Sequence, residues 1–158
     1  MPPTIFRATI PPGPWPFLAA GALAILVGGS LSAALAHAPT RPVMWLVAYL
    51  VLVVGAAQIV LGAGQWRLAV RPRSTAMLAL QWLLFNGANG LVMAGRLLAC
   101  PAAVAAGTLV LFIALALFWH GVRGARSGWV ARAYRAFVVL LGGSALVGIG
   151  LSLWRAAA

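Results

Sequence analysis

The sequence predicts an all-α fold, a polytopic membrane helical bundle with five transmembrane helices. Its 158 residues are 64% hydrophobic and only 7% charged, whereas a soluble domain is roughly half apolar and a quarter charged. That much apolar side chain exceeds what a soluble fold can cover with polar surface. We therefore expect residues 1–158 to form a single integral membrane domain.

Five apolar segments support this fold class, because each approaches the roughly 20 residues that cross a bilayer core as a helix. The first follows a proline-rich stretch, and the second and fourth start at Pro42 and Pro101, which suit the first turn of a helix. Ser74 precedes the third as a typical N-cap residue, and a Gly- and Arg-rich stretch precedes the fifth. The expected spans are residues 17–36, 43–65, 75–98, 101–119 and 135–154.

The first apolar segment also has features of a cleaved signal peptide. Arg7 precedes it, and residues 36–38 (Ala-His-Ala) follow the small-x-small pattern of a cleavage site. The segment is longer than the usual apolar region of a signal peptide, however, and Pro39 would directly follow the cleaved bond. We therefore expect the segment to remain as a span.

The arginines set the expected orientation, because cytoplasmic loops of membrane proteins carry an excess of positive residues. The N-terminus and the loops after the second and fourth spans share one side, which holds most of the arginines. We expect this side to be cytoplasmic, the C-terminus to lie outside, and the charges to contact anionic headgroups rather than nucleic acid. This side holds Arg7, Arg67, Arg71, Arg73, Arg123, Arg126, Arg132 and Arg135, and the other holds Arg41, Arg96 and Arg155.

The composition excludes several kinds of chemistry, because the sequence contains no Asp or Glu. Carboxylate pairs for glycoside hydrolysis, oxygen cages for magnesium or calcium, and Ser-His-Asp triads cannot form. His37 and His120 are expected on opposite sides of the membrane, so they cannot share a metal or a haem. We expect no cofactor and no metal site, and the single Cys100 allows no intrachain disulfide.

Amide side chains form the candidate polar face inside the membrane: Gln58 and Gln81, Asn86 and Asn89. Gln58 shares one helical face with Gln65, and Asn86 and Asn89 share one face of the next span. Matching depths across this hairpin puts Gln58 level with Gln81 and Tyr49 level with Asn89. It leaves Asn86 without a polar partner on the second span, so its amide must bond to another helix, a water or a ligand.

Three other features predict contacts. Arg96 lies near the outer end of its span and is a candidate contact for lipid phosphate, backbone carbonyls or an acidic group of a partner. The fourth span is nearly featureless, and we expect it to face lipid. The fifth contains Gly142, Gly148 and Gly150, which predict a packing surface within the protomer or between protomers.

Three functions can be weighed against these residues, and no motif identifies a family. The leading hypothesis is a non-enzymatic accessory or scaffold subunit of a membrane assembly, homo- or hetero-oligomeric through Gly/Ala-rich helix faces. The alternative is a small channel or transporter for a neutral solute along the candidate polar face. An enzyme that uses Ser or His, with Ser144 or Ser152 as the candidate nucleophile, is the weakest alternative. The lack of Lys beside abundant Ala, Gly, Leu and Arg indicates a bacterial cytoplasmic (inner) membrane.

Overall fold

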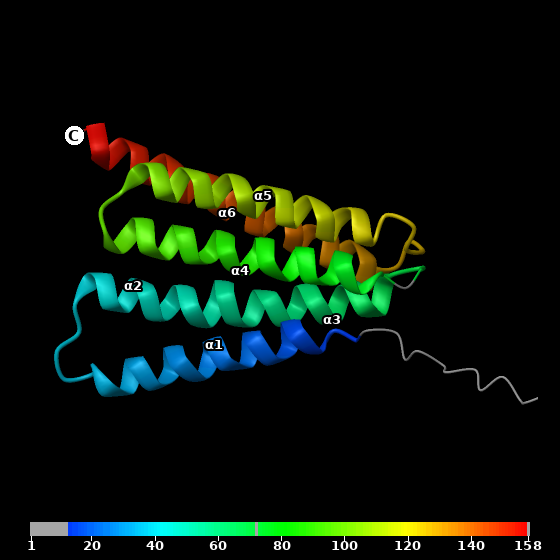
Figure 1. Ribbon diagram of the computed structural model, residues 1–158, viewed down its shortest axis with the longest axis horizontal. Helices are drawn as coiled ribbons and strands as arrows, with labels where there is room; N and C mark the ends of the chain where they lie inside the picture. The colour runs from blue at the N-terminus through cyan, green and yellow to red at the C-terminus, as the bar shows by residue number, and fades with distance from the viewer. Residues whose placement is uncertain (1–12, 72, 158) are drawn as a thin grey trace, which may run out of the picture.

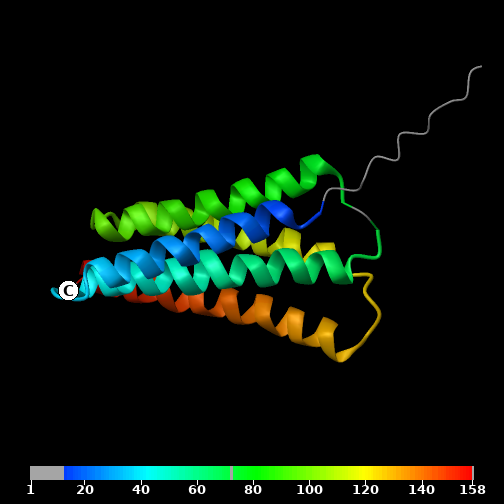
Figure 2. The ribbon, with the colours of Figure 1, turned by 90° about the horizontal axis from the view of Figure 1, so that it is seen from below.

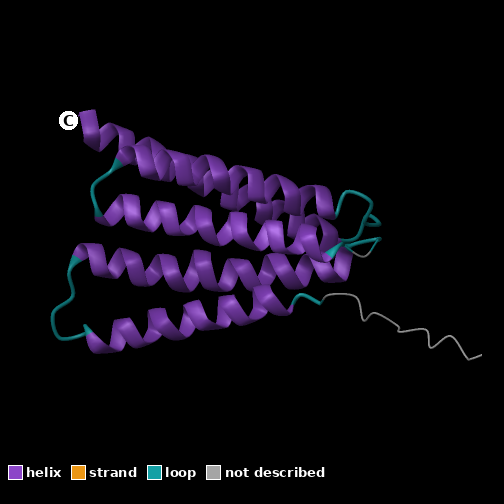
Figure 3. Cartoon of the chain, viewed as in Figure 1, coloured by secondary structure: helices purple, strands orange, loops and turns teal. Residues whose placement is uncertain are grey.

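The structure is a computed structural model that describes residues 13–71 and 73–157. These residues form helices joined by short loops, with no strand among them (Figure 3). Five of the helices are long and apolar enough to cross a membrane. The predictions of an all-α fold and of five candidate spans are therefore confirmed.

The helices follow the expected segments closely, with one clear difference at the last. It begins at Trp129 rather than at residue 135, directly after Ser127-Gly128. Hydropathy missed its first turns because they carry Arg132 and Arg135. A single long helix, Arg41–Leu68, contains a π-helical segment in its middle. The elements are α1 (Trp15–Ala34), α2 (Arg41–Tyr49), η1 (Leu50–Ala57), α3 (Gln58–Leu68), α4 (Thr75–Leu97), α5 (Pro101–Gly121) and α6 (Trp129–Ala157).

Local sequence explains where the helices begin and end. Ser74 is the N-cap of α4, and its Oγ accepts a hydrogen bond from the Met77 amide at 3.3 Å. The tight turn after α4 has Ala99 in the left-handed region, with φ 50°. The amide of Cys100 donates to the Gly95 carbonyl at 2.8 Å, which closes the end of the helix. Pro101 then starts α5 at once, so α4 and α5 form an antiparallel hairpin.

The bundle consists of two helix groups (Figure 1). In the first, α1 packs along the long helix α2–η1–α3, and in the second, α4 and α6 both pack on α5. Figure 2 shows α4 and α6 on opposite sides of the second group. The α1–α2 loop and the α4–α5 turn share one end of the bundle, here called the open end. The α3–α4 and α5–α6 loops share the other, the arginine-rich end.

The two groups join mainly through α3, which packs against α5 and α6. Phe17 of α1 is 1% exposed, and its ring meets Phe118 of α5 edge to face at a centroid distance of 5.6 Å. Phe85 of α4 meets Phe118 in the same way at 6.2 Å. Tyr134 of α6 donates to the Leu61 carbonyl of α3 at 3.2 Å. Four of the five long helices thus contribute an aromatic ring to the core near the arginine-rich end.

Helix α5 occupies the centre of the second group, so the prediction that it faces lipid is wrong. In its most apolar stretch 39% of the residues are buried, against 11% in α6. An apolar helix suits a protein interior as well as lipid, and the sequence alone does not distinguish the two. Small residues allow α5 to pack closely against its neighbours. Gly107 lies against the Ala88 carbonyl, Ala114 is fully buried, and Gly121 lies against the Gln65 side chain.

Helix α6 lies at the periphery, and most of its glycines have no close neighbour. A Cβ built on Gly142 would contact Phe112 at 3.4 Å. A Cβ on Gly143, Gly148 or Gly150 would meet nothing within 4 Å among the described residues. Of these glycines, Gly142 is therefore the one that contacts a neighbouring helix among the described residues.

Two arginines find partners in backbone carbonyls at the end of α5. Arg73 donates to the His120 carbonyl at 3.2 Å, and Arg135 donates to the Val122 carbonyl at 3.4 Å. The last carbonyls of a helix lack intrahelical partners and carry partial negative charge. In a chain without carboxylates, a helix C-terminus is thus one available counter-group for arginine.

Candidate ligand-binding pocket

The amides of the candidate polar face take part mostly in helix packing. Gln65 and Gln81 exchange two hydrogen bonds, at 3.1 and 3.2 Å, between α3 and α4. Both side chains are buried. The depth match with Gln58 is therefore wrong, and Gln65 is the partner of Gln81. Sequence spacing misplaced the pair because the register also depends on the loop geometry and on the π-helical segment.

The second interhelical bond follows the predicted depth. The Tyr49 hydroxyl donates to Asn89 Oδ1 at 2.8 Å, and Asn89 Nδ2 donates to the Phe85 carbonyl at 2.7 Å. Asn89 is fully buried. Asn86, by contrast, donates to the Trp82 carbonyl of its own helix at 2.8 Å. It needs no other helix or ligand for that donor, which corrects the expectation from its depth.

Gln58 is the exception among these amides. It is fully buried, and neither its Nε2 nor its Oε1 has a hydrogen-bond partner among the described residues. A buried amide without partners costs about 1–3 kcal/mol, whereas a satisfied one contributes to stability. Gln58 and Gln65 lie on the same helix α3, and they therefore contribute with opposite sign to the free energy of unfolding.

Replacing each of these two glutamines with Leu is expected to give effects of opposite sign. Gln58→Leu should raise the free energy of unfolding by about 1 kcal/mol, because it removes an unsatisfied amide. Gln65→Leu should lower it by about 1–2 kcal/mol, because the Gln81 amide loses both bonds. Unfolding by rising SDS fraction in a mild detergent measures both. Equal destabilisation by the two variants would contradict this account of Gln58.

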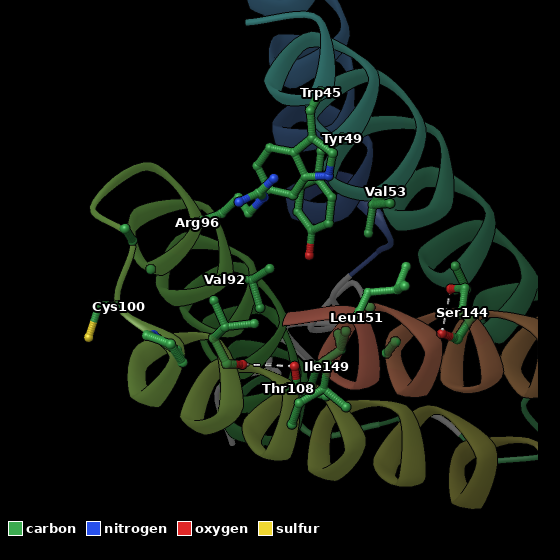
Figure 4. A pocket seen from close by; sticks show the side chains of 18 of the residues that line it. Trp45, Tyr49, Val53, Val92, Arg96, Cys100, Thr108, Ser144, Ile149 and Leu151 are labelled. Carbon is green, nitrogen blue, oxygen red and sulfur yellow. Dashed lines mark hydrogen bonds between the residues drawn. The ribbon is translucent and has the colours of Figure 1, made fainter. Parts of the chain in front are cut away.

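A pocket of about 660 Å³ lies between the two helix groups, and its lining reaches Ala99, Cys100 and Pro101 of the α4–α5 turn at the open end. Figure 4 shows the pocket from close by. One wall is formed by Trp45, Tyr49 and Val53 of the long helix. The α4–α5 hairpin and α6 form the others. The lining from α4 to α6 includes Phe85, Val92, Gly95, Arg96, Val104, Thr108, Leu111, Leu115, Leu141, Ser144, Ala145, Gly148, Ile149 and Leu151.

The hydroxyl groups of this lining donate their hydrogen bonds within the protein. Tyr49 donates to Asn89, Thr108 Oγ1 to the Val104 carbonyl and Ser144 Oγ to the Leu141 carbonyl, all at 2.8 Å. The inner walls therefore present mainly apolar surface. This use of Ser144 does not resemble a nucleophile held by a base. His37 follows α1 at the open end, and His120 lies in the last turn of α5 at the other end.

Positive charge gathers where the pocket opens. Arg41 and Arg96 both line it, and the Arg96 guanidinium lies over the Trp45 ring, 5.9 Å from its centroid. Figure 4 shows this stacked pair next to the cavity. Neither arginine donates a hydrogen bond to the protein among the described residues, in contrast to Arg73 and Arg135.

The structure thus separates the predicted site residues into two places. The lining of the pocket, as far as the structure describes it, contains none of Gln58, Gln81, Asn86 and Asn89. It contains Arg96, together with Arg41, Trp45 and Tyr49. The sequence analysis did not predict that these residues lie together. The spacing of Arg41, Trp45 and Tyr49 at successive helical turns was the available signal, since it predicts one face.

Comparison of the chain with known protein families, curated proteins and solved structures finds no significant match. The assignment of function therefore depends on the chemistry of the described residues. The described residues form an all-helical structure with five candidate membrane spans. It has a pocket between its two helix groups. Within the described residues, no group of three or more metal-binding side chains exists.

Proposed function

We propose that this chain is a non-enzymatic integral membrane protein of a bacterial cytoplasmic membrane that works as an accessory or scaffold subunit. The arginine-rich end faces the cytoplasm in this proposal, with the open end outside. The main support for this proposal comes from the half of α6 nearer the open end. This helix packs on α5 and, near its start, on α3. Gly143 and Gly150 have no neighbour within 4 Å among the described residues.

The uncovered surface suits a second transmembrane helix. Gly143 and Gly150 lie about two helical turns apart, and both have room for a neighbour. Leu146 and Val147 between them are 58% and 63% exposed. Small residues let helix backbones approach closely, and close packing drives helix association in lipid. The proposed partner is accordingly an apolar helix, from a second copy of this chain or from another subunit.

The alternative function, a pathway for a neutral solute along the candidate polar face, has less support. A pathway needs amides that face an open cavity. Gln81 and Asn89 are instead fully buried and bonded to Gln65, Tyr49 and the helix backbone. Their role as interhelical contacts accounts for their positions without transport.

The test uses protein extracted from native membranes in a mild detergent, with its size measured on native gels and by light scattering. We expect the wild type to migrate as a complex and Gly143→Leu to migrate as a monomer. Gly90→Leu is the matched control, since Gly90 of α4 also has nothing within 4 Å. A monomeric wild type, or a complex that tolerates Gly143→Leu, would contradict the proposal.

A further inference from the structure

The pocket has the dimensions of a site for a long apolar chain. Its wall on α5 runs from Pro101 to Leu115, a length of about 21 Å at the helical rise per residue. That exceeds half of a bilayer core of roughly 30 Å. Its volume of about 660 Å³ falls within the usual range for ligand sites. One apolar chain that extends from a leaflet surface toward the bilayer centre therefore fits this space.

Apolar side chains line the part of the pocket farthest from the open end. Phe85, Leu115 and Leu141 line it there, and Phe85 also packs against Phe118 in the core. Because the hydroxyls of Tyr49, Thr108 and Ser144 already donate within the protein, a polar ligand would find few donors inside. The interior thus favours hydrocarbon over a water-soluble molecule.

The opening favours a negative group. Arg41 and Arg96 line it, and the chain has no Asp or Glu that could neutralise them. A guanidinium presents donors in a fork that matches phosphate oxygens, and such charge-assisted bonds are strong. Trp45 holds Arg96 beside the pocket through its ring face. A ligand with a phosphate at one end and a hydrocarbon chain at the other would satisfy both parts.

We propose that this pocket binds an amphiphile whose phosphate headgroup carries net negative charge, with the phosphate on Arg41 and Arg96 and an apolar chain between η1, α5 and α6. The site lies at the open end, away from the arginine-rich end that the positive-inside rule assigns to headgroup contacts. The phosphate belongs either to a phospholipid of the leaflet, with one of its two chains in the pocket and the other outside it, or to an isoprenoid phosphate. This proposal does not depend on the proposed assembly. The ligand would lie against Gly148 in the pocket lining, whereas the partner helix would pack at Gly143, outside the lining.

Native mass spectrometry of the purified protein tests the proposal with three added probes. These are dioleoyl phosphatidylglycerol, farnesyl phosphate and dioleoyl phosphatidylcholine. We expect at least one anionic probe to form about tenfold more adduct than the zwitterionic lipid, which corresponds to about one charge-assisted hydrogen bond. A greater yield with phosphatidylglycerol identifies a leaflet phospholipid as the source, and a greater yield with farnesyl phosphate identifies an isoprenoid. Equal adducts for all three probes would overturn the proposal.

Variants separate the charge from the cavity. The double variant Arg41→Gln with Arg96→Gln should lose the preference for the anionic probes, while Arg71→Gln at the other end should keep it. Gly148→Leu should reduce adducts of the preferred probe severalfold by filling the pocket, and Gly143→Leu, outside the lining, should not. Both arginines are exposed, so the double variant is expected to fold even if Gly148→Leu does not. An unchanged preference in the double variant would refute the proposal.

Discussion

Replacing Phe118 with Ala is expected to lower the free energy of unfolding by roughly 2–3 kcal/mol. Phe118 is fully buried and touches the rings of Phe17 and Phe85, so its removal leaves a cavity where α1, α4 and α5 meet. In soluble proteins such a change costs about 3–5 kcal/mol, part of which is transfer from water. Apolar solvent reduces that part, and the lost packing and ring contacts remain.

The measurement is SDS-induced unfolding in a mild detergent, followed by near-ultraviolet circular dichroism. Leu109→Ala is the matched control, since Leu109 lies on the same helix and is 64% exposed. It should change the unfolding midpoint little. A Phe118→Ala protein as stable as the control would mean that the ring contacts of Phe118 with Phe17 and Phe85 do not hold the two helix groups together.

The second large effect is expected at Gly62, where Ala should lower the free energy of unfolding by about 1–2 kcal/mol. A Cβ at this position would overlap the Phe17 side chain and lie 2.9 Å from its Cγ. Overpacking of this kind costs about 1–3 kcal/mol, which outweighs the helix propensity of up to about 1 kcal/mol that Ala gains over Gly.

Gly87→Ala provides the comparison for this prediction, because a Cβ on Gly87 of α4 would meet nothing within 4 Å. There only the propensity gain remains, so the midpoint of unfolding should rise slightly. The same SDS titration compares the two variants. Stabilisation by both substitutions would show that α1 does not pack closely on α3 at Gly62.

The fold class was predictable because it follows from solvent preference. A chain with 7% charged residues and five apolar segments has few alternatives to a helical membrane bundle. Helix starts were predictable where a local rule applies, as at Ser74 and Pro101. These features depend on residues close in sequence, which is why they could be anticipated.

Packing between helices was less predictable. An all-apolar helix such as α5 gives no sign of which face is buried, and its central position depends on contacts with Phe17, Gln65 and Phe85 from distant segments. The pairing of Gln81 with Gln65 required the actual register of α3 and α4. The pocket itself was not predictable, because it results from the separation of two helix groups. Only the shared helical face of Arg41, Trp45 and Tyr49 could be predicted, from their spacing.

The junction through α3 also gives the bundle a mechanical asymmetry. The buried aromatic core joins the two helix groups near the arginine-rich end, whereas the contacts described nearer the open end are the Tyr49–Asn89 bond and the Arg96–Trp45 pair. The core is therefore the natural pivot for a rotation of one group against the other. Displacement grows with distance from a pivot, and the open end is the farthest point. In a bilayer, lateral pressure on the long helix and α6 would therefore change the width between Trp45 and Ile149 more than any spacing near Phe118.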